Sequence, residues 1–249
     1  MWTRLRPWVF PVLLLTALEL YVRSVADSSD ALAPPTQALK AWWELLWLTT
    51  DEGLWRVTGF TLGTAALGLL LGAFLGLVLG LILGLSQRAG HMSFLTIEVL
   101  RPIPSVALIP LAMLVFGFGV RMELSVVAFA TFWPMLILTQ AAARQVEPRL
   151  LEVSAALGLS AWQRTQWIVL PAMIPRLFVA LRLGVAVALV VAVTVEIAAN
   201  PHGMGYAMMI AQQSMEHARM LAWLFWIGVV GMLLDLMFAQ AQKVVTYVE

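Results

Sequence analysis

The sequence predicts an all-α integral membrane protein of about six transmembrane helices, with a polar helical hairpin between two of them. Of the 249 residues, 61% are hydrophobic and 12% are charged, whereas soluble domains are about 45–50% apolar and about 25% charged. Uncharged stretches recur that are long enough for the roughly 20 helical residues that cross a bilayer core. Residues 147–175, in contrast, are too polar to lie within a bilayer.

The composition excludes several kinds of site. The net charge is +1, so no basic surface indicates nucleic-acid binding. The chain lacks cysteine, which excludes disulfides and thiol nucleophiles, and its three histidines (His91, His202 and His217) are scattered, so we expect no metal site and no catalytic residues. Neither Lys40 nor Lys243 follows a glycine, so the chain has no phosphate loop for ATP.

The first apolar run, residues 7–22, has two interpretations. A signal peptide cleaved near residues 24–26 is one of them. We favour an uncleaved first membrane helix, because Glu19 interrupts the run and Arg23 lies close to that cleavage site.

Residues 27–52 are more polar and hold three tryptophans within residues 42–47. Indole rings favour the headgroup level of a membrane, so we expect an amphipathic helix at the outer interface. The sequence therefore divides into residues 1–56, with the first transmembrane helix and this interfacial segment, and residues 57–249, with five further transmembrane helices.

Residues 57–87 carry no charge, which predicts one long spanning helix. Glycine recurs at every fourth position of this stretch, at Gly68, Gly72, Gly76, Gly80 and Gly84. Such a stripe lets another backbone approach closely. We expect tight packing here, within the chain or between two copies.

Three prolines, Pro102, Pro104 and Pro110, must bend or break the next apolar segment. Glu98 and Arg101 lie three residues apart before them, which allows a pair on one helix face. Irregular backbone at membrane depth is tolerated where protein covers it or where it lines a cavity. Arg101 is therefore either an anchor at the inner interface or a residue beside a path through the membrane.

Three more spans follow. Residues 117–123 predict a short outer turn, and residues 124–143 a span kinked at Pro134. Residues 177–199 and 220–242 are the last two spans, joined by an outer loop.

Four ionisable residues fall within or at the ends of spans: Glu19, Arg182, Glu196 and Asp235. A charge at the bilayer centre costs at least about 2.5–3.5 kcal/mol, so each is expected to face protein, water or an interface. For Glu196 we favour an anchor at the outer helix end over a gating role, and for Arg182 a side chain that extends toward the inner interface. Neutral polar candidates for a path are Thr131, Thr139, Gln140 and Thr194.

The polar segment, residues 147–175, is predicted to form two short helices. Pro148 suits a first helical position, and Gly158 suits a left-handed C-cap. Residues 160–163, S-A-W-Q, fit a capping box. Pro171 and Pro175 are expected to end the second helix.

The same segment resembles the transmembrane subunits of bacterial ABC importers. Their pattern E-A-A-x3-G-x9-I-x-L-P is matched by Glu152, Gly158, Ile168, Leu170 and Pro171, with Val-Ser in place of Ala-Ala. The resemblance implies that residues 147–171 form the coupling helix that docks on an ATPase subunit. The residues implied in docking are Leu151, Glu152, Ala155, Ala156, Leu157, Gly158 and Ser160.

Other strings narrow the resemblance to the nitrate/sulfonate/taurine branch of that family. R-P-I-P-S-V-A-L-I-P-L, starting at Arg101, is similar to its R-P-x-P-x-x-A-x-x-P-L. V-T-V-E-I around Glu196 is similar to V-A-A-E-M, and G-M-G-Y at residues 203–206 to G-L-G-Y. The resemblance covers nearly the whole chain from Gly53 onward.

The resemblance implies an importer subunit that is not itself an enzyme. It would form the path for a small, anionic, sulfonate-, taurine- or nitrate-like solute, as a homodimer with two ATPase subunits and an extracytoplasmic solute-binding protein. ATP and magnesium would bind to the ATPase, and this chain would carry no cofactor. Residues of the path or gate would include Arg101, Thr131, Gln140, Arg182, Thr194 and Glu196.

Charge distribution gives the expected orientation in a bacterial inner membrane. With six spans and both termini cytoplasmic, inner segments hold Arg4, Arg6, Arg88, Arg144, Arg149, Arg164, Arg176 and Lys243. Outer segments hold Arg23, Lys40, Arg56, Arg121 and Arg219. This excess of basic residues inside favours a cytoplasmic hairpin.

Two other functions would leave their own signatures in the sequence. An autonomous ion-coupled secondary transporter predicts an internal repeat and paired midplane carboxylates, and the sequence shows no clear repeat. A membrane enzyme predicts clustered histidine, aspartate or cysteine residues, and none cluster here.

Overall fold

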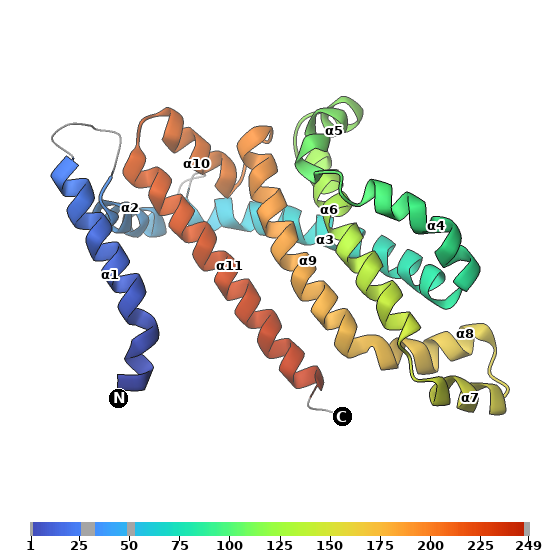
Figure 1. Cartoon of the computed structure of the whole chain (residues 1–249). Coiled ribbons are helices and arrows are strands. Elements are labelled where there is room, and N and C mark those ends of the chain that lie inside the picture. Colours follow the sequence, from blue (N-terminus) through green and yellow to red (C-terminus); the bar gives the residue numbers. More distant parts are fainter. Residues whose placement is uncertain (1, 26–32, 49–52, 247–249) are drawn as a thin grey trace.

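The computed structural model describes residues 2–25, 33–48 and 53–246, and within these ranges all regular secondary structure is helical (Figure 1). The helices are α1 (Trp2–Val25), α2 (Pro35–Trp47), α3 (Leu54–Leu85), α4 (Gln87–Leu100), the 3₁₀ turn η1 (Ser105–Leu108), α5 (Ile109–Phe116), α6 (Val120–Arg144), α7 (Pro148–Ala156), α8 (Ala161–Arg164), the π-helical turn η2 (Thr165–Val169), α9 (Leu170–Ala198), α10 (Met204–Gln213) and α11 (His217–Thr246).

Within the described part of the chain, four helical stretches are long and apolar enough to cross a membrane: Leu54–Leu85, Val120–Arg144, Ala161–Ala198 and His217–Lys243. A fifth span results if α4 and the η1–α5 segment, which are bent by 81° at their junction, count as one. These findings confirm the all-α membrane class. The expected additional span, α1, is not among them, so a total of six remains a prediction.

The glycine stripe of α3 packs against α6, as expected from its spacing. A Cβ atom added to Gly68 would lie 2.6 Å from Val127 Cγ1, and one added to Gly76 would lie 2.7 Å from the Phe132 carbonyl oxygen. Added at Gly80, it would lie 2.7 Å from the carbonyl oxygen of Leu136. Backbone thus meets backbone along most of α3, which fixes the position of α6 in the bundle.

Of the two predictions made from proline positions, one is confirmed and the other is wrong. The bend after α4 is confirmed, since α4 ends at Leu100 and Pro102 and Pro104 follow it. The prediction that Pro171 and Pro175 end the hairpin helix is wrong. Both lie in α9, which continues from α8 through η2. The π-helical turn directly precedes Pro171, so the helix widens where the missing N–H of proline would interrupt an α-helical ladder.

The first residues of α1 and the last residues of α11 lie at the same end of the bundle as the α7–α8 hairpin (Figure 1). We call this the hairpin end, and the opposite end, where α6 begins and α9 ends, the distal end. The main core lies between α3, α6 and α9, with residues of α5 added to it. A second cluster joins α2, α10 and α11 to the distal parts of α3 and α9.

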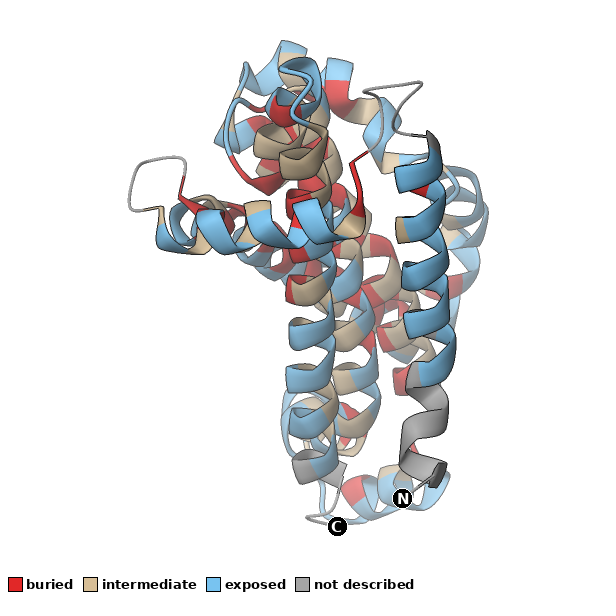
Figure 2. Cartoon of the chain, turned by 90° about the vertical axis from the view of Figure 1, so that its left-hand side faces the viewer, coloured by how far each residue is buried: buried red, intermediate tan, exposed pale blue. Residues whose placement is uncertain are grey.

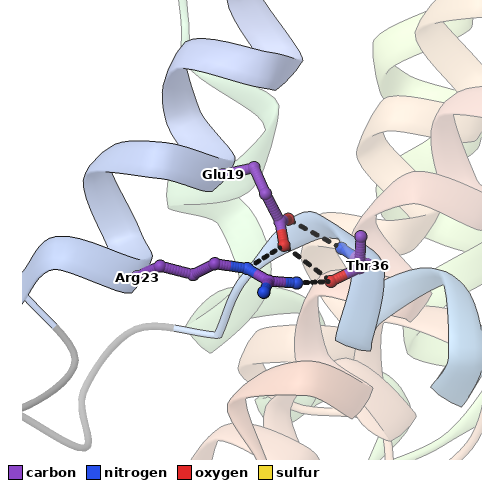
Figure 3. Close-up of polar contacts among 3 residues, drawn as sticks. All are labelled: Glu19, Arg23 and Thr36. Atoms are coloured by element: carbon purple, nitrogen blue, oxygen red, sulfur yellow. Dashed lines mark hydrogen bonds and ion pairs between the residues drawn. The ribbon is translucent and has the colours of Figure 1, made fainter.

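Helix α1 stands apart from this core, and most of its described side chains are exposed (Figure 2). It is joined to α2 by a polar contact (Figure 3). The Glu19 carboxylate accepts hydrogen bonds from Thr36 N at 3.1 Å, Thr36 Oγ1 at 2.8 Å and Arg23 Nε at 2.7 Å. Glu19, which interrupts the apolar run of the sequence, therefore caps the first turn of α2.

Candidate functional site

The hairpin of α7 and α8 has the local geometry that its sequence predicts. Gly158 has a φ of +66°, and its N–H donates to the Ala155 carbonyl at 3.0 Å. The side chains and backbones of Ser160 and Gln163 form the reciprocal capping box, with bonds of 3.3 and 2.9 Å. Each turn is closed by its own residues, so the hairpin holds its shape through local bonds.

The expected docking residues lie on the surface of this hairpin. Leu151 is half-buried, and the others (Glu152, Ala155, Ala156, Leu157, Gly158 and Ser160) are exposed. Four further large apolar side chains of this segment, which were not among the expected docking residues, are also exposed: Leu150 at 38%, Val153 at 51%, Trp162 at 74% and Trp167 at 68%. Exposed apolar side chains on a polar hairpin are typical of an interaction surface, so the docking role stays a prediction. Their exposure depends on how the helices pack, so sequence pattern alone does not predict it.

Arg101 lines a hollow of about 480 Å³ beside the bend between α4 and η1. The other walls come from η1, α6 and α9, including Ser105, Trp133 and Leu183. Arg101 is the only charged residue among the described residues that line it. Its ion pair with Glu98 spans 4.0 Å between half-exposed side chains, so the guanidinium remains open to another anion.

The four neutral path candidates lie elsewhere. Thr139 is fully buried on α6. Thr131 is fully buried against α3, and its hydroxyl donates to the Val127 carbonyl at 2.9 Å. Gln140 lies half-buried near Gly90, and the Thr194 hydroxyl donates to the Val190 carbonyl at 2.7 Å. None of them lines the hollow beside Arg101. Thr131 occupies a helix interface, which favours a packing role for it.

Arg182 pairs with Asp235, a contact that sequence reasoning missed. Arg182 Nε and Nη2 donate to the two Asp235 carboxylate oxygens at 2.7 and 2.8 Å, which joins α9 to α11. The helix begins at Leu170 rather than near residue 177, so Arg182 lies well inside it. Its charge is therefore balanced by a partner within the bundle, rather than by extension of the side chain to the inner interface.

The distal end contains a buried polar cluster. Glu196 is fully buried, and Gly205 N donates to its Oε2 at 2.9 Å. Glu123, which the sequence placed in an outer turn, is also fully buried, because α6 begins at Val120 and turns this side chain inward. Asn200 Nδ2 donates to Glu123 Oε2. Glu196 thus binds the backbone of the α9–α10 turn from a buried position, and the choice between an outer anchor and a gate stays a prediction.

Two more hollows lie at the distal end. One of about 860 Å³ is lined by residues of α2 and the start of α11, and another of about 340 Å³ by residues of α3, α10 and α11. The described residues contain no group of three or more histidine, cysteine, aspartate or glutamate side chains that could hold a metal ion.

Comparison with known proteins decides the family. Residues 68–245 match the model of the binding-protein-dependent transport system inner membrane component. The chain belongs to this family. It is a multi-pass membrane protein of the ABC importer permease class, and the family is one of transport components rather than enzymes.

Individual relatives agree with this assignment. The chain is 34% identical over 171 residues to the aliphatic sulfonates transport permease SsuC of Bacillus subtilis, covering 69% of this chain and 62% of that protein. It is 31% identical over 214 residues to SsuC of Escherichia coli, covering 86% and 80%. Escherichia coli TauC, a taurine transport system permease, is 27% identical over 220 residues, covering 86% and 79%.

The fold is shared with a solved transporter. An inward-facing structure of the MetNI methionine ABC transporter superposes with a TM-score of 0.69 at 17% identity, covering 79% of this chain and 99% of that one. At this identity the likeness shows the fold alone. It confirms the all-α importer-subunit fold that the resemblance implied.

Proposed function

We propose that the chain is the membrane-spanning subunit of an ATP-driven importer for a small organic or inorganic anion. Two copies would form the path, two ATPase subunits would bind their hairpins, and a solute-binding protein would deliver the solute at the distal end. The observation that carries the anion preference is the hollow beside Arg101, whose described lining has one cation and no acidic residue.

The exposed apolar face of the hairpin supports ATPase docking. Leu157, Trp162 and Val153 present apolar surface at the same end as the first residues of α1 and the last residues of α11. That shared end is expected to be cytoplasmic because basic residues concentrate in the segments assigned to it. The chain has no phosphate loop, so ATP and magnesium would bind to the partner.

Reconstitution tests this proposal. The chain, its ATPase subunit and its solute-binding protein are placed in proteoliposomes, and uptake of taurine, an alkanesulfonate and nitrate is measured with and without ATP. We expect ATP-dependent uptake of at least one of these anions. Uptake driven by an ion gradient without the ATPase, or sustained ATP hydrolysis by the chain alone, would contradict the proposal and favour an autonomous secondary transporter.

Arg101→Gln tests the hollow. A charge-assisted hydrogen bond contributes about 1.5–3 kcal/mol, so loss of the guanidinium should reduce uptake at limiting solute by about tenfold or more. Arg121→Gln is the matched control, because Arg121 is exposed at the distal end and lines none of the hollows described above. Equal uptake by both variants would place the solute path elsewhere.

A further inference from the structure

The buried polar cluster at the distal end contains two carboxyl groups and, among the described residues, no basic side chain that pairs with them. Glu123 of α6 and Glu196 of α9 are both fully buried, and Asn200 is 1% exposed beside them. Asn200 joins the two acids into one cluster, because its side chain bonds to Glu123 and its backbone N–H bonds to the carbonyl of Val195, the neighbour of Glu196. Among the described residues, no lysine, arginine or histidine forms an ion pair with either one.

An uncompensated charge of this kind is costly. A buried ionised carboxylate without a partner loses its hydration with nothing to replace it, and two such groups together also repel one another. Acidic side chains at membrane depth are normally paired for this reason. The negative charge of Glu123 and Glu196 therefore has to be neutralised by something that the side chains nearby do not supply.

The hydrogen bonds of the cluster show what is missing. Three buried oxygens have no donor within the described structure: Glu123 Oε1, Glu196 Oε1 and Asn200 Oδ1. The hydroxyls of Thr61 and Thr64 lie next to the two carboxylates, and each also lies within donating distance of an α3 carbonyl oxygen, at 3.4 and 3.0 Å. Each hydroxyl has one hydrogen for these competing acceptors. All three unpaired atoms are acceptors, so the cluster has fewer hydrogen donors than acceptors, and it has no positive charge.

A proton supplies both. A water molecule would donate hydrogen bonds but would leave the charge unchanged. A metal ion would need space between its ligands, and neither carboxylate lines any of the three hollows described above. A proton needs no cavity, and as an O–H group it donates to a neighbouring acceptor oxygen.

We propose that Glu123 and Glu196 form a buried proton-binding site, occupied at neutral pH, that holds the α9–α10 turn against α3 and α6. Glu196 accepts the N–H of Gly205, Glu123 accepts the amide of Asn200, and Thr61 Oγ1 accepts the N–H of Met204 at 2.9 Å. The turn is thus hydrogen-bonded to Glu123 at its start, through Asn200, and to Thr61 and Glu196 at its end.

This site also explains one glycine of the G-M-G-Y string. A Cβ atom at Gly203, whose φ is +93°, would overlap the Glu196 carboxyl group. Gly203 therefore lacks a side chain because the carboxyl group occupies that space. At Gly205 the close neighbours are the backbone carbonyl oxygen of Val193 and the Cβ atom of Glu196, so helix packing excludes a side chain there.

Infrared spectroscopy of the purified chain in nanodiscs tests the proposal. At neutral pH we expect a carbonyl stretch of a protonated carboxylic acid that exchanges slowly in deuterium oxide and shifts when the chain carries ¹³C-labelled glutamate. The double variant Glu123→Gln with Glu196→Gln should remove it, whereas Glu152→Gln, at an exposed hairpin residue, should leave it intact. If a variant does not fold, the isotope shift in the unsubstituted chain still shows whether a protonated glutamate is present.

A cation titration tests the alternative that a metal cation, rather than a proton, occupies the site. The thermal unfolding of the chain is measured after chelation and then with added sodium, potassium or calcium chloride at constant ionic strength. We expect no specific shift of the unfolding temperature. A rise with one cation that is absent in Glu123→Gln, or the lack of a slowly exchanging acid band, would overturn the proton as the occupant.

Discussion

Gly158 adopts a φ of +66° at the turn of the hairpin, a conformation that costs residues with a Cβ atom about 1–2 kcal/mol. Gly158→Val should therefore distort the surface around Leu157. We expect weaker association with the ATPase subunit, measured as the fraction of ATPase that co-purifies with the tagged chain.

Gly158→Asn is the matched control, because asparagine tolerates the left-handed region better than a β-branched residue. No atom lies within 4 Å of a Cβ added at this position, so backbone strain alone separates the two variants. Co-purification that is unchanged in Gly158→Val would count against a docking role for this turn.

The pair of Arg182 and Asp235 gives a second prediction for single residues. Arg182→Leu leaves an acid unpaired on a spanning helix, so the thermal unfolding temperature of the chain in nanodiscs should fall. The exchanged double variant, Arg182→Asp with Asp235→Arg, should recover part of that loss, because the side chains of α9 and α11 would again pair. If the exchange recovers nothing, the contact contributes little to the fold.

For single residues, the sequence predicts contacts between neighbours along the chain but not contacts between residues far apart in it. The caps at Gly158 and Ser160 follow from residues within four positions of each other, so local pattern finds them. Arg182 and Asp235 lie 53 positions apart, and Glu123 bonds to Asn200 across 77 positions. Their partners depend on how the helices pack, which composition and spacing do not determine.

Among the helices, the α3–α6 contact gives a prediction with an internal control. Gly76→Leu places a side chain where backbone atoms of α6 lie less than 3 Å from the new Cβ, so it should destabilise the fold by about 1–3 kcal/mol or more. Gly63→Leu lies on the same helix with no atom within 4 Å of its Cβ. Urea or thermal unfolding in nanodiscs should separate the two variants clearly, and equal stability would contradict the packing.

Spacing predicted the packing face of α3 but not the helix that covers it, because any close backbone would satisfy a small-residue stripe. The proline rule failed at Pro171 and Pro175. Proline interrupts a regular α-helical ladder, whereas this chain changes to π-helical pitch at residues 165–169, before the ring is reached. The pitch change has no signature in hydrophobic period, so the sequence could not indicate it.

For the whole molecule, the orientation of the two ends can be measured directly, since the chain has no native cysteine. Leu157→Cys at the hairpin and Phe118→Cys at the distal end are both highly exposed. In intact spheroplasts an impermeant maleimide should label Phe118→Cys alone, and permeabilisation should expose Leu157→Cys. The reverse pattern would invert the proposed topology.

The stretch Ala161–Ala198 runs without interruption from the hairpin to the buried acid pair, over 38 residues. At a rise of about 1.5 Å per residue it is about 57 Å long. Because no loop interrupts this stretch, a tilt imposed at the hairpin would be transmitted along the helix to the α9–α10 turn. The π-helical turn at Thr165–Val169 is the one departure from α-helical pitch within it. A variant that restores α-helical pitch there would rotate the hairpin relative to the buried end, while leaving the residues at both ends unchanged.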